Sequence, residues 1–146
     1  MGMTRAEMDK IVDDHFRFEA TDDLDGVMSS LADGPLRHEI IPSPFGEISD
    51  RQQIRDYYRM LYACARGDRA TCIRRLYGDD FLVDETLWEG EIVDGKPFLM
   101  EGKTGRGKNR LLHVFVFRDG KIAYEQAWID LAAMQRYCDA PAKAEA

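Results

Sequence analysis

The chain has 146 residues, and its 20 Lys and Arg against 27 Asp and Glu give a net charge of −7 at pH 7. Phosphate groups and anionic lipids are bound by clustered basic side chains. Here the basic residues are scattered, so we expect neither nucleic acid nor a membrane surface as a partner. The length suits one domain that folds without disulfides or metals. We therefore predict a single domain over residues 1–146, with an ordered core at about 4–137.

The cysteines give no sign of a disulfide framework. There are three of them, Cys64, Cys72 and Cys138, and none forms a CxxC pair. The sequence also has no signal-peptide pattern and no run of 18 apolar residues. We expect a cytoplasmic protein with reduced thiols.

Hydrophobic periodicity predicts three helices in the first half of the chain. Thr4 and Glu7 have the spacing of a capping box, followed by apolar residues at helical spacing to about Ala20. A second, short helix is expected over 24–31. A third begins after the N-cap Asp50 and is closed by Gly67.

From residue 70 onward the pattern becomes that of strands. Residues 95–109 are rich in Gly and Lys and predict a loop, with room for a short strand at 98–100. A last helical segment is expected at 131–137, before a tail. The predicted strands are 36–41, 70–77, 81–92, 111–117 and 122–128. Helices followed by a run of strands indicate an α+β fold.

The strand at 111–117 is apolar on both of its alternating faces, with His113 the one exception. A strand of this kind must be covered on both sides. Helices of one small domain can cover one face only. We therefore expect a homodimer in which a second copy covers the other face.

Residues 102–109, Gly-Lys-Thr-Gly-Arg-Gly-Lys-Asn, are close to the P-loop pattern. A P-loop needs a helix directly after it, so that the N-terminus of the helix binds phosphate. A strand is predicted to follow here, so we expect a solvated hairpin loop or pocket lid and no nucleotide.

Three segments, 37–42, 53–58 and 114–122, together resemble the nuclear transport factor 2-like superfamily, and most of all its SnoaL-like polyketide cyclase and ketosteroid isomerase-like branch. The resemblance spans about residues 4–137. It implies a cystatin-like α+β fold, with a cone-shaped, curved antiparallel or mixed sheet covered by three N-terminal helices. It also implies a ligand pocket on the concave side and a dimer interface on the convex side.

The register of the last hairpin decides what lies opposite His113. A three-residue loop at 118–120 places it opposite Glu125, whereas a two-residue loop at 119–120 places it opposite Gln126. The resemblance favours the first register.

In that register His113 and Glu125 form a cross-strand pair, lined by Phe115 and Phe117. A carboxylate fixes the tautomer of an imidazole and raises its basicity, so the pair suits a general acid or base, or a polar anchor for a ligand. The simpler interpretation is a histidine hydrogen-bonded within a half-buried sheet.

Other candidates for the pocket are Glu39, Glu85 and Tyr58, which could orient a ligand. The simpler interpretation is a surface or dimer-face charge for the two glutamates and a core side chain for the tyrosine. His15 is interpreted as a satisfied core or rim histidine. No His, Glu or Cys spacing is diagnostic of metal ligands, so the sequence predicts neither a metal nor a cofactor.

Cyclases and epoxide hydrolases of this fold resemble the chain through the last strand, where their catalytic Asp precedes a second Asp by three residues. Asp130 matches the second Asp, and the catalytic position is Ala127. We expect a protein that binds a small hydrophobic, carbonyl-bearing molecule. If it is an enzyme, cofactor-free acid–base isomerisation, cyclisation or hydrolysis is the expected chemistry. The alternative is a non-catalytic binding or dimerisation module.

Overall fold

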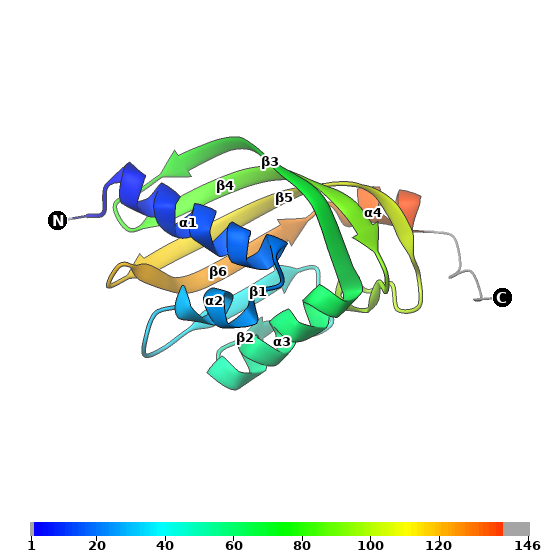
Figure 1. The fold of residues 1–146 in the computed structure, drawn as a ribbon, viewed down its shortest axis with the longest axis horizontal. Coiled ribbons are helices and arrows are strands. Elements are labelled where there is room, and N and C mark those ends of the chain that lie inside the picture. Colours follow the sequence, from blue (N-terminus) through cyan, green and yellow to red (C-terminus); the bar gives the residue numbers. More distant parts are fainter. Residues whose placement is uncertain (1, 139–146) are drawn as a thin grey trace.

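The computed structural model describes residues 2–138 of the chain, so the predicted tail lies outside the described residues except at its start. Three N-terminal helices precede most of the strands, and a short helix follows the last strand (Figure 1). The helices are α1 (Arg5–Ala20), α2 (Leu24–Ser29), α3 (Arg51–Cys64) and α4 (Leu131–Tyr137), with a 3-10 turn, η1 (Lys96–Phe98). The strands are β1 (Arg37–Ile41), β2 (Glu47–Ile48), β3 (Ala65–Tyr77), β4 (Phe81–Ile92), β5 (Gly105–Arg118) and β6 (Lys121–Ile129).

The six strands form one sheet in the order β2-β1-β6-β5-β4-β3. Strand β1 pairs parallel with β6, and the other pairs are antiparallel. Figure 1 shows a curved sheet with α1, α2 and α3 on the same side of it. The predicted α+β fold with a curved mixed sheet and helices on one face is confirmed. No helix in residues 2–138 is both long and apolar enough to span a bilayer.

The helix starts follow the predicted capping residues. The Thr4 side chain accepts a hydrogen bond from the Glu7 N–H, and the Glu7 carboxylate accepts one from the Thr4 N–H. Asp50 caps α3 in the same way, by accepting from the Gln53 N–H. The end of α3 differs from the prediction, because the chain leaves the helix at Cys64 and enters β3 directly.

The prediction of a loop over 95–109 is wrong in its second half. Residues 105–110 are the start of β5 and pair with the end of β4. A Cβ at Gly107 would lie only 2.3 Å from the ring of Tyr137, so glycine here permits close packing rather than a flexible loop. At 98–100, where a short strand had room, η1 ends at Phe98 and Met100 forms only an isolated β-bridge with Gly95. The P-loop-like segment, residues 102–109, therefore continues into strand β5 and not into a helix.

The β5–β6 hairpin follows neither of the two predicted registers throughout. Its turn is the two-residue Asp119-Gly120, with φ of 54° and 74° at the two positions. Phe117 is consequently opposite Ile122, as in the second register. One step further the partners are Val116 and Tyr124, so Ala123 is an extra residue in a β-bulge.

The bulge determines which side chains face each other beyond it. His113 lies opposite Ala127, and Glu125 lies opposite Phe115. All four side chains share one face of the sheet, because their positions differ by even numbers. Glu125 is therefore a diagonal neighbour of His113 rather than its direct partner.

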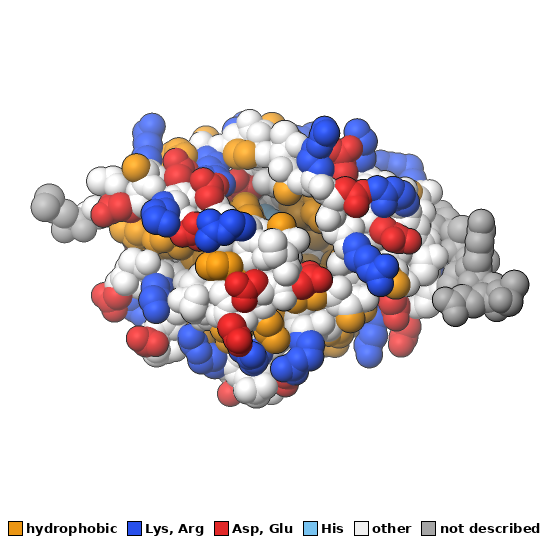
Figure 2. All heavy atoms as spheres, in the orientation of Figure 1, with side chains coloured by type: hydrophobic (Ala, Val, Ile, Leu, Met, Phe, Trp, Pro, Cys, Tyr) orange, Lys and Arg blue, Asp and Glu red, His pale blue; other side chains and the backbone are white. Residues whose placement is uncertain are grey.

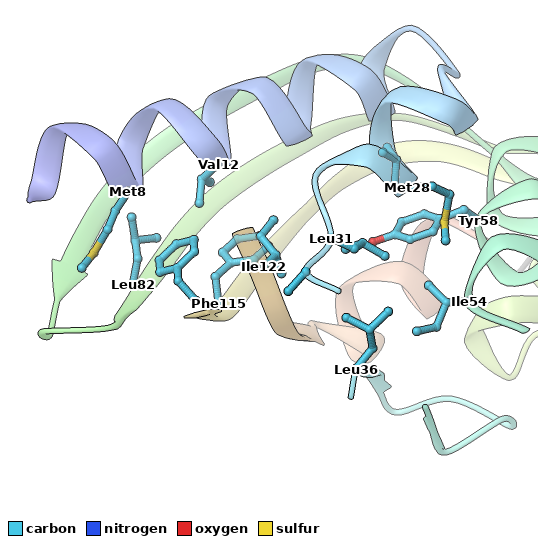
Figure 3. Packing of buried hydrophobic residues seen from close by; sticks show 13 residues of the cluster. Met8, Val12, Met28, Leu31, Leu36, Ile54, Tyr58, Leu82, Phe115 and Ile122 are labelled. Carbon is cyan, nitrogen blue, oxygen red and sulfur yellow. The ribbon is translucent and has the colours of Figure 1, made fainter. Parts of the chain in front are cut away.

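The main core lies between the helices and this concave face of the sheet (Figure 3). Met8 and Val12 point from α1 toward Leu82 and Phe115. Phe115 and Phe117 are 0% and 5% exposed and belong to this cluster. Fully burying a side chain of this size contributes roughly 1.5–3 kcal/mol, so this layer fixes α1 on the sheet.

Candidate functional site

A cavity of about 380 Å³ lies between the helices and the concave face of the sheet. Figure 2 shows this face hollowed near its middle, with hydrophobic side chains in the depression. Its lining is mostly apolar and includes Phe16, Leu61, Tyr62, Trp88, Phe98 and Leu111. One group of its polar side chains surrounds Glu125, and others, such as Arg66 and Asp68, come from β3.

Glu125 is the centre of a buried polar cluster. It is 3% exposed, and its Oε2 lies 3.2 Å from Nε2 of His15 on α1 and 3.7 Å from Nε2 of His38 on β1. The Tyr58 hydroxyl, on α3, donates a hydrogen bond to the same carboxylate oxygen. Side chains from α1, β1 and α3 thus meet at one carboxylate of β6.

The orientation of the His15 ring is fixed by Ser30. The Ser30 hydroxyl donates its one hydrogen to the carbonyl of Val27 at 2.5 Å, so its oxygen accepts from Nδ1 of His15 at 2.8 Å. Nδ1 therefore carries a hydrogen, and Nε2 points at the carboxylates. Besides Glu125, this nitrogen lies 3.2 Å from Oε1 of Glu19, one helical turn further along α1.

Burial and charge oppose each other in this cluster. Burial lowers the pKa of His15, but the carboxylates of Glu125 and Glu19 outweigh it and raise that pKa from 6.5 to about 10. Burial raises the pKa of Glu125, but the nearby His15 holds it well below its usual range. Burial lowers the pKa of His38 and raises that of Tyr58. At neutral pH, therefore, His15 and Glu125 form an ion pair, and the adjacent His38 and Tyr58 are neutral.

His113 lines the same cavity but does not join this cluster. Its ring is parallel to that of Phe115, with 5.4 Å between the centroids, and the ring of Phe16 meets its edge. Its buried Nδ1 has no hydrogen-bond partner within residues 2–138, so the direct pair predicted with Glu125 does not form. The two-residue turn and the β-bulge each shift the register by one residue, so Ala127 rather than Glu125 lies opposite His113.

The predicted site residues therefore separate into three groups. His113, Glu125 and Tyr58 line the cavity. Phe115 and Phe117 lie in the adjoining core, where the ring of Phe115 stacks on the ring of His113.

Glu39 and Glu85 lie on the opposite face of the sheet. Alternation along β1 and β4 directs their sequence neighbours, His38 and Thr86, into the cavity instead. Glu39 accepts a hydrogen bond from Gln126 at 3.1 Å. Glu85 is ion-paired with Arg110 and Arg74, and these two guanidinium groups lower its pKa.

Sequence reasoning missed His15, His38 and Glu19 as site residues. Of the three histidines of the chain, His38 and His113 line this cavity and His15 contacts Glu125 in its wall. The i, i+4 spacing of His15 and Glu19 is the one local signal of a shared face. Glu125, the partner of His15, lies on the last strand, and no local pattern links it to α1.

A curved mixed sheet, helices on its concave face and an apolar cavity between them define a nuclear transport factor 2-like protein. The family model of the SnoaL-like domain matches residues 12–125, and the chain belongs to this family. No curated protein matches the sequence significantly.

Solved structures share the whole architecture at low sequence identity. TsrD from Streptomyces laurentii is 20% identical, with a TM-score of 0.73 over 93% of this chain and 97% of that one. An isomerase-like protein from Bacillus subtilis, described as a putative isomerase, is 12% identical, with a TM-score of 0.73 over 90% and 92% of the two chains. An LEH-like epoxide hydrolase from M. tuberculosis is 16% identical, with a TM-score of 0.66 over 90% and 88%. At these identities the similarity establishes the fold alone.

Proposed function

We propose that the protein binds a small, largely apolar molecule in the cavity, with a polar group such as a carbonyl directed toward His113 and Tyr62. The observation that carries this proposal is that two residues lining the cavity, His113 and Tyr62, each have a buried polar atom, Nδ1 and Oη, without a partner within residues 2–138. An unsatisfied buried polar group costs about 1–3 kcal/mol, so a ligand that bonds to it gains affinity. The volume of about 380 Å³ falls in the range of small-molecule sites.

We further propose that the bound molecule undergoes proton transfer, in an isomerisation, cyclisation or hydrolysis. His113 is the candidate acid or base, because its ring is held by two aromatic rings and faces the cavity. Glu125 and Tyr58 form the polar wall beside it. The folds of the epoxide hydrolase and the isomerase-like protein are consistent with this class of reaction.

The alternative is a module that binds the same kind of molecule without converting it. Ala127 favours this alternative, because it lies directly opposite His113 and cannot move a proton or orient water. Binding without turnover of epoxides or ketones would identify the protein as such a module.

Ligand binding can be measured through Trp88, which lines the cavity and is one of two tryptophans in the chain. In a Trp128→Phe background, its fluorescence is titrated with cyclic ketones and epoxides such as cyclohexenone and limonene oxide. Ala127→Leu should fill the cavity and weaken binding more than tenfold, and His113→Phe should weaken it about tenfold, as expected for about 1.4 kcal/mol.

The matched control is Gln126→Leu, which adds a leucine to the same strand on its opposite face. It should leave binding unchanged. Equal affinities of Ala127→Leu and the parent protein would contradict binding in this cavity.

We also propose that a second copy of the chain covers the outer face of the sheet. Leu112 and Trp128 are cross-strand partners on that face and remain 37% and 46% exposed. Exposed apolar side chains that adjoin each other are typical of an interface.

A further inference from the structure

Three side chains place atoms of the kind that bind metal ions around one point in the wall of the cavity. These atoms are His15 Nε2, Glu19 Oε1 and Glu125 Oε2, and all lie within 4.8 Å of one another. We propose that they form a binding site for a divalent transition-metal ion, with Zn²⁺ as the representative ion.

The distances between these atoms suit a tetrahedral ion. Ligands at about 2.0–2.2 Å from Zn²⁺ lie roughly 3.3–3.6 Å from each other. Nε2 of His15 lies 3.2 Å from Glu19 Oε1 and 3.2 Å from Glu125 Oε2. An ion can therefore be accommodated by small side-chain movements.

The second layer of contacts holds the ligands in the required orientation. The carbonyl of Val27 fixes the Ser30 hydroxyl, which in turn accepts from Nδ1 of His15. This leaves the Nε2 lone pair of a neutral His15 directed at the two carboxylates. Tyr58 donates to Glu125. Such outer contacts are typical of metal-binding histidines and carboxylates.

Charge balance also favours a divalent ion. Two carboxylates and a neutral imidazole carry a charge of −2, which one divalent cation neutralises. A proton on His15 instead leaves −1, and within residues 2–138 no Lys or Arg forms an ion pair with Glu19 or Glu125. An unbalanced charge is costly here because Glu125 is 3% exposed.

The ion would also be placed to act on a bound molecule. Glu19 and Glu125 both line the cavity, so a coordination position left open by the protein faces the ligand space. There a metal ion can polarise a carbonyl or lower the pKa of a bound water. Metal binding itself requires no organic ligand, so this inference is independent of the proposed function.

The test is a titration of tag-free protein that has been stripped with EDTA and dialysed. Zn²⁺ binding is followed by calorimetry and Co²⁺ binding by visible absorption, which reports the coordination geometry. The expected result is one ion per chain. Glu19→Gln and His15→Gln should each weaken binding at least 100-fold. The Glu19 side chain is 25% exposed, so Glu19→Gln should fold normally even if His15→Gln does not.

The control variant Cys72→Ser retains the three ligands and removes an exposed thiol. It should bind the ion as the parent protein does. Absence of binding by the parent protein, or equal affinity in Glu19→Gln, would overturn the inference. Loss of all metal binding in Cys72→Ser would also overturn the inference. If the stripped protein binds no metal ion but still binds an apolar probe, the metal inference fails while the proposed ligand binding stands.

Discussion

His15 and Glu125 form a buried ion pair, with 3.2 Å between Nε2 and Oε2, although one lies on the first helix and the other on the last strand. Both side chains are almost completely buried, at 0% and 4% exposed. The pair connects α1 to β6 at the wall of the cavity, which Glu125 lines. It therefore contributes to the stability of the fold as well as to the chemistry of the site.

Replacing one member of the pair should destabilise the protein strongly. In Glu125→Gln the protonated His15 loses its main counter-charge, and breaking a buried pair in this way costs on the order of 3 kcal/mol. Urea unfolding at pH 7 in the presence of EDTA measures the loss. Glu39→Gln is the control, because Glu39 lies on the half-buried outer face, and it should cost less than about 1 kcal/mol. Similar losses in the two variants would contradict a special role for the pair.

The metal-free protein should lose stability as the pH rises above neutral. The pKa of His15 is raised from 6.5 to about 10 in the folded state. Its stabilising contribution is therefore complete below pH 6.5 and is lost as the pH rises through 10. Glu125, whose pKa is lowered, contributes above its unfolded value of 4.5 and loses this contribution as the pH falls further.

The measurement is the free energy of unfolding in EDTA between pH 6.5 and 10, for the parent protein and for His15→Gln. The difference between the two should shrink by up to about 1.4 kcal/mol per pH unit, the free-energy equivalent of one pKa unit. Parallel curves would show that His15 is not protonated in the folded protein.

The fold was largely predictable because most of its signals are local. The capping residues Thr4 and Asp50 mark the starts of α1 and α3, and alternation marks β4 and β6. The start of β5 was not predictable in this way. Its Gly-rich sequence resembles a loop, and it becomes a strand by pairing with β4.

The site was predictable only in part, because its contacts join distant segments. Glu125, His113 and Tyr58 were identified, but the two-residue turn and the extra residue Ala123 together changed how the first two face each other. Alternation grouped the side chains of each strand by face correctly. It could not tell which face was concave, so Glu85 was assigned to the pocket although it lies on the other side.

A second buried charge cluster anchors the start of α1 to the sheet and gives a further stability prediction. Arg75 on β3 is 10% exposed and ion-pairs with Asp84 on β4 at 2.8 Å and with Asp9 on α1 at 2.9 Å. Asp84 is 0% exposed, so Arg75→Met leaves a buried carboxylate without its cation. The expected cost is on the order of 3 kcal/mol.

The neighbouring Arg74 offers a matched control. It pairs with Glu85 on the outer face, but its side chain is 66% exposed, so Arg74→Met should cost less than about 1 kcal/mol. Thermal and urea unfolding of both variants give the comparison. A loss in Arg74→Met as large as that in Arg75→Met would contradict the difference in burial as its cause.

The last prediction concerns the outer face of the sheet. If Leu112 and Trp128 lie in a homodimer interface, the protein should sediment at twice its chain mass of 16.7 kDa, and Trp128→Glu should sediment as a monomer. The reason is that a carboxylate at the centre of an apolar interface is desolvated without a partner. Phe45→Glu is the control, because it replaces a 40% exposed aromatic ring that packs on Tyr57 of α3, away from this face. It should leave the dimer intact. Sedimentation of the parent protein as a monomer at micromolar concentration would show instead that this face is exposed to water, with its apolar residues tolerated between the surrounding ion pairs.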